Sequence, residues 1–168
     1  MPVFWKRGFA DTSLQELEQA TGVNKSGLYA EFRDKEDLFL ESLRYYLTSQ
    51  RKRRLLTKEP LGWNNIETFL KRGPRNNKDE KGCFSVNSMR ELAILPEQTH
   101  AIVSDYRENL RRLLIANIAA EKPKMAPESI AEMILVFFSG LCIEHNLKSA
   151  RSGAADKVAS LMDVVRSL

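Results

Sequence analysis

The sequence predicts an all-α protein with a small N-terminal helix-turn-helix domain followed by a larger helical domain. Its six prolines and eight glycines lie almost wholly between segments of helical periodicity, and no segment alternates apolar and polar residues as a strand would. The 168 residues suffice for one compact domain, or for a small domain that shares a core with a larger one. With 43% apolar and 29% charged residues, the chain is typical of folded globular proteins and too apolar for intrinsic disorder.

No segment has the pattern of a membrane span or a secretory signal. The longest mostly apolar window runs from Met133 to Ile143, well short of the ~20 residues that cross a bilayer. The first seven residues lack a long apolar stretch and a small-residue cleavage site. We therefore expect a cytoplasmic protein without a membrane partner.

The two cysteines and the net charge narrow the function only slightly. Cys83 and Cys142 lie far apart without a C-x-x-C pair, which predicts two buried thiols and neither a disulfide framework nor a zinc knuckle. A net charge of +4 permits nucleic-acid binding without requiring it.

A helix is predicted over residues 13–20. Ser13 and Glu16 have the spacing of a capping box, in which each side chain satisfies an amide at the helix start. Gly22 follows within a three-residue turn, because glycine readily takes a positive φ at a helix C-terminus.

Two further helices follow this turn. One covers Lys25 to Phe32, with Asn24 as its N-cap, and Asp34 caps the next, which is long. The apolar stripe of that long helix fades into a basic run from Arg51 to Arg54. We interpret the run as a solvated helix end, which the helix dipole favours, with a separate nucleic-acid site as the alternative.

Beyond this point the chain again divides into helices. Residues 60–63 break the long helix, Asn64 or Asn65 can cap a helix through Leu70, and residues 73–82 form a polar loop. The remaining expected helices are Phe84 to Leu95, Glu97 to about Glu121, Glu128 to about Ala150, and Ala154 to Leu168.

The helix over residues 13–20 and the helix from Lys25 to Phe32, with the glycine turn between them, predict a helix-turn-helix. The second helix of such a motif places its first turn in the major groove of DNA. That turn is Lys25, Ser26 and Gly27. Lysine can reach guanine acceptors or a phosphate, and a glycine lets the backbone approach the bases. Buried helical hairpins contain the same kind of turn, so a purely structural hairpin is the alternative.

A longer motif resembles the DNA-binding region of TetR-family (TetR/AcrR-like) transcriptional repressors over about residues 3–46. It consists of Gly8-Phe9-x-x-Thr12-Ser13-Leu14, then Thr21-Gly22-Val23-Asn24-Lys25-Ser26-Gly27-Leu28-Tyr29-x-x-Phe32-x-x-Lys35-Glu36-x-Leu38. The resemblance implies a ligand-responsive repressor that binds an operator as a homodimer. It divides the chain into a DNA-binding domain over residues 1–46 and an effector-binding and dimerisation domain over residues 47–168.

Six residues of this region are the candidate DNA contacts: Ser13, Lys25, Ser26, Gly27, Tyr29 and Lys35. The Tyr29 hydroxyl can donate to a phosphate, unless the ring is a core residue. Ser13 can face a phosphate, although capping explains it equally well. A cation at Lys35 is unfavourable in a first helical turn unless an anion lies there too, which a phosphate would supply.

The chain departs from the family pattern at two places. The family has a full helix before the equivalent of Gly8-Phe9, so we expect the first helix to be incomplete here. Glu31 stands where the family often has an aromatic residue or histidine. Its carboxylate would weaken phosphate binding or accept from a cytosine amine, and both readings stay open.

The helix that begins at Glu128 has two apolar faces, which predicts burial on two sides. One face can cover the subunit's own core and the other a symmetry mate, so we expect a homodimer through the last two helices. The first face comprises Ile130, Ile134, Phe137, Phe138, Leu141 and His145, the second Met133, Val136, Gly140, Ile143 and Leu147, and the last helix adds Val158, Leu161, Met162, Val165 and Leu168.

Several residues of the larger domain could line a pocket for a small, largely apolar effector, or could simply fill the core. They are Phe69, Cys83, Asn87, Tyr106, Phe137, Leu141 and His145. Cys142 and His145 fall short of a metal site. No catalytic or cofactor motif occurs, so we expect no cofactor and no enzyme activity. A ligand-binding or scaffold protein without DNA binding is the main alternative, and a small helical enzyme the other.

Overall fold

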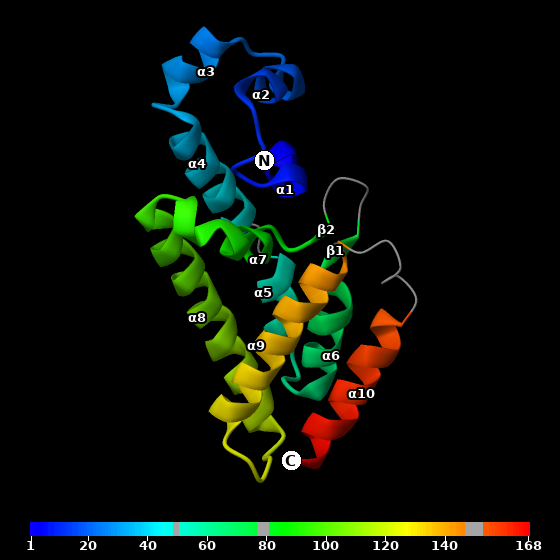
Figure 1. Cartoon of the computed structure of the whole chain (residues 1–168). Coiled ribbons are helices and arrows are strands. Elements are labelled where there is room, and N and C mark those ends of the chain that lie inside the picture. Colours follow the sequence, from blue (N-terminus) through cyan, green and yellow to red (C-terminus); the bar gives the residue numbers. More distant parts are fainter. Residues whose placement is uncertain (49–50, 77–80, 147–152) are drawn as a thin grey trace.

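A computed structural model describes the chain except for residues 49–50, 77–80 and 147–152. The described residues confirm the all-α class with an N-terminal helix-turn-helix. Figure 1 shows an elongated molecule in which the first helices form one end and the C-terminal helices extend to the other. No described helix combines the length and the hydropathy that crossing a membrane requires.

The helices α1 to α3, called the head below, are short. Their bounds are Pro2–Arg7, Leu14–Thr21 and Lys25–Glu31, and α4 follows over Lys35–Thr48. The predicted capping box of Ser13 is present, Gly22 adopts the left-handed conformation, and the Asn24 side chain accepts from the amide of Gly27. The local signals at the helix ends therefore suffice to set these boundaries.

The helices from α5 onward, called the body below, pack as a bundle. Helix α8 packs on α9, and α6 lies between α5 and α10. The elements are α5 (Arg51–Leu56), α6 (Trp63–Arg72), β1 (Arg75–Asn76), β2 (Lys81–Gly82), α7 (Phe84–Ser88), the 3-10 helix η1 (Met89–Ile94), α8 (Glu97–Ala120), α9 (Pro127–Glu144) and α10 (Ala154–Ser167). The two short strands pair antiparallel inside the predicted polar loop.

Several expected boundaries differ from the structure. The long helix expected after Asp34 is described as two helices, α4 up to Thr48 and α5 from Arg51. The segment predicted as one helix from Phe84 is an α-helical turn followed by the 3-10 helix η1. Helix α9 ends at Glu144, and the rest of its expected extent lies largely outside the described residues. Helix α6 has Gly62 as its N-cap, so neither Asn64 nor Asn65 caps it.

Aromatic rings join the head to the body. The ring of Phe84, at the start of α7, stacks on Trp5 of α1 with centroids 5.8 Å apart and meets Phe39 and Tyr46 of α4 edge to face. Trp5 and Tyr46 are themselves in edge contact at 4.9 Å. These rings are buried, so the apolar core runs without interruption from α1 into the body.

Asn117 of α8 joins α8 to the turn before α6. Its amide nitrogen donates to the carbonyl oxygens of Leu56 and Leu113 at 2.7 and 2.8 Å. Its oxygen accepts from the Gly62 amide at 3.0 Å and from the Asn65 side chain at 2.9 Å. All four hydrogen-bonding positions of a fully buried amide are thus satisfied. Asn65 serves this network because its side chain points inward.

We expect Asn117→Ala to lower the free energy of unfolding by about 2–4 kcal/mol, because it leaves buried partners without hydrogen bonds. Urea denaturation followed by circular dichroism measures the loss. Asn109→Ala, at an exposed position of the same helix, is the matched control and should change stability by less than about 0.5 kcal/mol. Equal effects of the two substitutions would contradict the structural role of Asn117.

Candidate nucleic-acid interface

Helix α3 presents a polar face at the end of the molecule remote from the C-terminus (Figure 1). Lys25, Ser26 and Tyr29 are exposed on it, while Leu28 is 5% exposed and packs into the core. A short helix anchored by one apolar residue, with cationic and hydroxyl side chains outward, has the geometry that a major-groove reader needs.

The junction between α2 and α3 is fixed by side chains that satisfy amides. The Glu18 carboxylate accepts from the backbone amide of Lys25, and Asn24 accepts from Gly27 at 2.9 Å. These bonds use the α3 amides within the protein and leave the Lys25 side chain directed to solvent.

Tyr29 is a surface residue. Its side chain is 39% exposed, which excludes the core interpretation of its ring. The Lys25 ammonium lies 5.8 Å from the ring centroid, a cation–π distance that places both side chains on the same surface of α3.

Ser13 serves primarily as a helix cap in this structure. Its hydroxyl accepts from the Glu16 amide at 3.3 Å and donates to the Glu16 carboxylate at 3.0 Å. Hydrogen bonds from the Ser13 amide and hydroxyl, with a smaller contribution from Arg7, hold the pKa of Glu16 below its usual value. A phosphate contact of Ser13 stays a prediction.

Lys35 has partners within the protein. Its ammonium donates to the Thr12 carbonyl oxygen at 2.8 Å and lies 4.4 Å from the centroid of the Phe9 ring. The unfavourable placement of a cation in a first turn is therefore offset without a phosphate. The phosphate contact of Lys35 stays a prediction.

Glycine at position 27 has a steric role within the protein, in addition to the close approach of the backbone to the bases that the sequence suggested. A Cβ atom at this position would lie 2.6 Å from Cγ1 of Val23, in the turn before α3. A side chain there would push apart the turn and the helix, so glycine permits their close packing.

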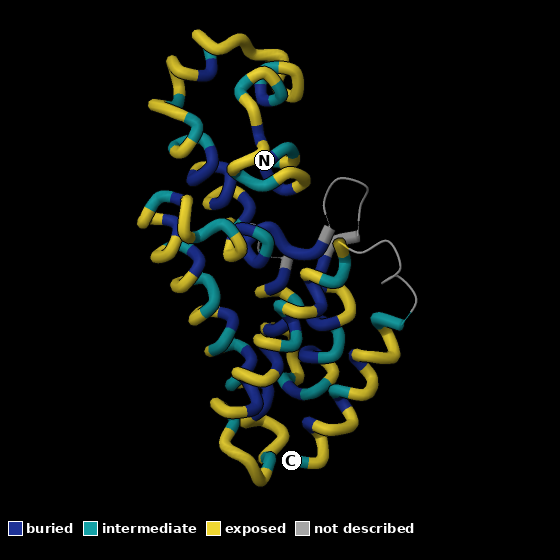
Figure 2. Tube along the Cα trace, viewed as in Figure 1, coloured by how far each residue is buried: buried dark blue, intermediate teal, exposed yellow. Residues whose placement is uncertain are grey.

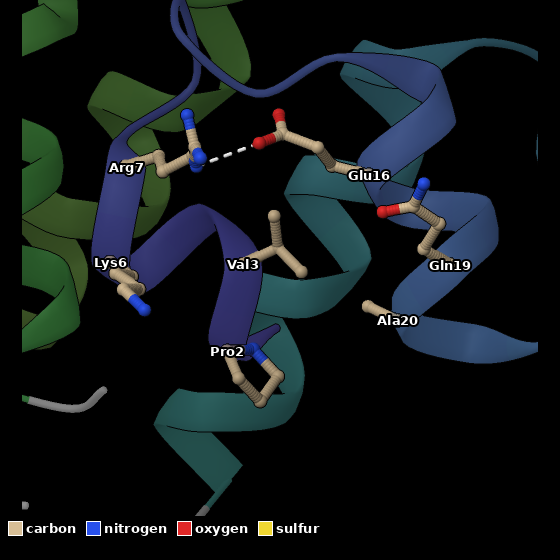
Figure 3. A pocket seen from close by; sticks show the side chains of 7 residues that line it. All are labelled: Pro2, Val3, Lys6, Arg7, Glu16, Gln19 and Ala20. Atoms are coloured by element: carbon tan, nitrogen blue, oxygen red, sulfur yellow. Dashed lines mark ion pairs between the residues drawn. The ribbon is translucent and has the colours of Figure 1, made fainter. Parts of the chain in front are cut away.

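A hollow of about 360 Å³ lies between α1 and α2 (Figure 3). The Arg7 guanidinium closes one side of it through an ion pair with Glu16, with 2.8 Å between Nε and Oε1. This pair links α1, observed here as a six-residue helix, to the capped start of α2. The hollow is lined by Pro2, Val3, Lys6, Arg7, Glu16, Gln19 and Ala20.

Comparison with known proteins identifies the head. The family model described as bacterial regulatory proteins, tetR family, matches residues 1–42. Residues 1–42 thus match the N-terminal region of the TetR family. The HTH-type transcriptional repressor ComR of Escherichia coli is 47% identical over 47 residues, which cover 28% of this chain and 22% of ComR. The matched segment thus spans about a fifth of that relative.

Solved structures extend the likeness to the whole fold. A TetR-family transcriptional regulator from Agrobacterium tumefaciens superposes with a TM-score of 0.84 at 14% identity, covering 98% of this chain and 92% of that chain. One from Cytophaga hutchinsonii gives a TM-score of 0.83 at 19% identity, covering 99% of this chain and 89% of that chain. At such identities the body is shown to share the fold of these regulators.

Among the cavities lined by described residues, the one beside Cys83 reaches two of the seven residues predicted to bind an effector, and the effector site stays a prediction. A cavity of about 20 Å³ in the body is lined by Cys83 and Tyr106, together with Ser85, Val86, Met89, Val103, Arg107, Leu110, Leu135, Phe138 and Ser139. Phe69 is fully buried and stacks on Phe138 at 4.6 Å, and Leu141 is buried. Asn87, Phe137 and His145 are half-buried and do not line this cavity.

Lys52 corrects the interpretation of the basic run. Arg53 and Arg54 are exposed as expected, but Lys52 is 5% exposed and points into the body. Its Nζ lies 2.9 Å from the sulfur of Cys83. The sequence held a signal for this, because Lys52 precedes Leu55 and Leu56 by three and four positions and so shares their inward face.

We expect Ser13→Ala to lower the free energy of unfolding by about 1 kcal/mol, because α2 loses its cap. Ser13→Asn, which restores a capping oxygen, should retain most of the stability, and thermal denaturation measures both. If Ser13→Ala proves as stable as the wild type, the cap is not the role of Ser13.

Proposed function

We propose that this protein is a ligand-responsive transcriptional repressor that binds double-stranded operator DNA through α3. The observation that carries the proposal is the outward face of α3, where Lys25, Ser26 and Tyr29 are exposed within a head of the TetR family. In this proposal residues 1–46 bind DNA, and residues 47–168 receive the signal and form the dimer. A scaffold without DNA binding is the outcome that a failed DNA-binding test would favour.

A homodimer through α9 and α10 is part of the proposal. Figure 2 shows exposed stretches along both helices, and some of the exposed residues are apolar. Val136 is 65% exposed, Met133 40% and Ile143 44%, and Val164 of α10 is 57% exposed. A second copy that covers this face would remove the patch from water, and two-fold symmetry would present two heads to successive major grooves.

Three residues of the expected dimer interface are buried within the single subunit. Val158 and Val165 are 1% exposed and Met162 is 0% exposed, so these residues fill the subunit core. Val164 takes the outward position instead. Leu147, also expected on this face, lies outside the described residues.

The proposed effector is a small, largely apolar molecule that binds within the body. The cavity beside Cys83 and Tyr106 has a volume of about 20 Å³, which is room for roughly one water molecule. An effector of ordinary size therefore requires the helices around this cavity to separate, and that movement is what would carry the signal to the head.

We expect Lys25→Ala and Tyr29→Phe to weaken operator binding without loss of stability, because both side chains are exposed on α3. Loss of a cationic phosphate contact would lower affinity for all sequences and reduce the salt slope by ~1. Gel-shift titration against the DNA upstream of the protein's own gene measures the effect.

Arg112→Ala is the control for this test, since it removes one charge at an exposed position in the C-terminal half of α8. That half of α8 extends away from the head (Figure 1). It should leave the affinity unchanged. Unchanged affinity in Lys25→Ala and Tyr29→Phe as well would remove α3 as the DNA-reading helix.

We expect Val136→Asp and Val164→Asp to weaken the dimer by about a hundredfold or more, because each places a carboxylate in an apolar interface. Both positions are exposed in the single chain, so the fold should persist. Sedimentation measures the association. Ile94→Asp, at a position of η1 that is 56% exposed, is the control. A wild type that is monomeric at micromolar concentration would contradict the proposed dimer.

A further inference from the structure

The body contains a buried lysine whose ammonium contacts a cysteine. Lys52 Nζ lies 2.9 Å from the Cys83 sulfur and 2.9 Å from the Tyr46 hydroxyl oxygen. The Tyr46 hydroxyl donates to the same sulfur at 3.3 Å, and the Ser85 hydroxyl oxygen is 3.1 Å from it. Cys83, Lys52 and Tyr46 are all buried. Several hydrogen-bonding groups therefore converge on one sulfur atom.

The surroundings favour a positive charge on Lys52. Its ammonium lies 5.1 to 5.5 Å from the ring centroids of Tyr46, Tyr106 and Phe138. Among the described residues no carboxylate forms an ion pair with it. A buried ammonium needs a compensating charge, and the neighbour able to supply one is the Cys83 sulfur as a thiolate.

The pKa directions agree with this ion pair. Burial by itself raises the pKa of the Cys83 thiol, but hydrogen bonding from Cys142 and the Lys52 charge outweigh it and place the pKa well below its usual value. Burial lowers the pKa of Lys52, but the Cys83 charge holds it well above its usual value. Burial, with a smaller contribution from Cys83, raises the pKa of the Cys142 thiol, which favours its neutral form.

Gly82 brings the two cysteines together. It adopts a φ of +70°, and a Cβ atom there would lie 2.3 Å from the Cys142 carbonyl oxygen. Only a residue without a side chain lets the chain approach α9 this closely. Cys83, the next residue, is thereby set in hydrogen-bonding contact with Cys142.

We propose that Cys83 is an oxidant-sensing site, at which a hydroperoxide is reduced by the Lys52-paired sulfur and Cys142 completes a disulfide. The thiolate attacks one peroxide oxygen, so that an S–O bond forms, the O–O bond breaks and an alkoxide or hydroxide leaves. The sulfur is oxidised to a sulfenic acid, and the peroxide is reduced to an alcohol or water.

Lys52 is placed to supply the proton that the leaving oxygen needs. Once the Cys83 charge is consumed, burial disfavours the ammonium and releases its proton. The Cys142 sulfur then attacks the sulfenic sulfur, an S–S bond forms, and the hydroxyl leaves as water with the Cys142 thiol proton. Two thiol groups and one hydroperoxide thus give a disulfide, an alcohol and water.

The cavity beside Cys83 suits a small oxidant. Its volume of about 20 Å³ is close to that of one water molecule, and exposed Met89 is among its lining residues. Hydrogen peroxide is little larger than water, whereas a bulky electrophile would not enter. Selection by size thus distinguishes the two kinds of thiol reagent.

Oxidation would be transmitted to the head through α7 and η1, a step that rests on the proposed DNA-binding function. Cys83 immediately precedes α7, whose Phe84 stacks on Trp5 of the head. At the other end of the segment, the Glu91 carboxylate accepts from the amides of Phe9 and Ala10 at 2.8 and 2.9 Å. Loss of the Lys52–Cys83 ion pair at one end of this segment would therefore change how the head packs against the other end.

The thiol chemistry is tested on the full chain by mass spectrometry after hydrogen peroxide treatment, without DNA. We expect the native protein to lose the two thiol hydrogens as the Cys83–Cys142 disulfide forms. In Cys142→Ser, Cys83 should stop at the sulfenic acid, which dimedone traps once the oxidised protein is unfolded in urea, and in Cys83→Ser, Cys142 should stay reduced.

Two comparisons make this test decisive. Oxidation of Cys83 should be faster in the native protein than in the urea-unfolded chain, which an inert buried thiol would not show, while N-ethylmaleimide should react faster with the unfolded chain. Lys52→Met should slow peroxide oxidation by about tenfold or more, with Arg53→Met, at an exposed neighbouring position, as control. If Lys52→Met does not fold, the native-to-unfolded comparison still decides. Native thiols that stay reduced, or equal oxidation of Cys142 in Cys83→Ser, would overturn the proposal.

The transmission step has a separate readout. Peroxide should change the DNA affinity of the wild type and leave that of Cys83→Ser unaltered. Disulfide formation with unchanged DNA affinity would overturn the transmission step while leaving the sensing site in place, and absence of DNA binding in the untreated protein would instead count against the proposed function.

Discussion

The contact of Phe84 with the head is the interaction on which the arrangement of the molecule depends. Its ring is fully buried between Trp5 of α1 and the α4 residues Phe39 and Tyr46. Burial of such rings is favourable, so the cluster stabilises the contact between head and body. Their edge-to-face packing is directional, so it also fixes the angle between the two. The division proposed near residue 46 therefore separates two functions that share one core.

Polar groups inside the body favour one particular packing of this core over the alternatives. Asn117 satisfies a set of backbone groups that no apolar side chain could satisfy, and Lys52 has its charge compensated by sulfur and aromatic rings. Both side chains are costly to bury unpaired, so each strongly favours the packing in which its partners are present. The partner of Lys52, the Cys83 sulfur, can be oxidised in our proposal. The packing that Lys52 favours therefore depends on the oxidation state of Cys83.

Local signals made the head predictable, whereas long-range contacts made parts of the body unpredictable. Caps, a glycine turn and apolar spacing are properties of neighbouring residues, and they gave the correct helices from Ser13 to Asp34. Lys52 was misread because the basic run around it hides its inward register. Glu91 carries no sequence signal for its role, since its partners lie more than eighty residues away. The residues predicted to bind an effector stay a prediction, because periodicity identifies buried faces and not the voids between them.

The bridge from Glu91 to the amides of Phe9 and Ala10 also bears on how the chain folds. These bonds span separations of 82 and 81 residues, and the stack of Phe84 on Trp5 is almost as distant in sequence. During synthesis the helix-turn-helix therefore emerges well before the residues that complete its packing. The helix-turn-helix therefore reaches its final stability only after these distant residues have packed against it. Such contacts require the slow closure of a long loop. A fragment that ends within α4 would lack both the hydrogen bonds from Glu91 and the stack of Phe84 on Trp5, even if its helix caps were intact.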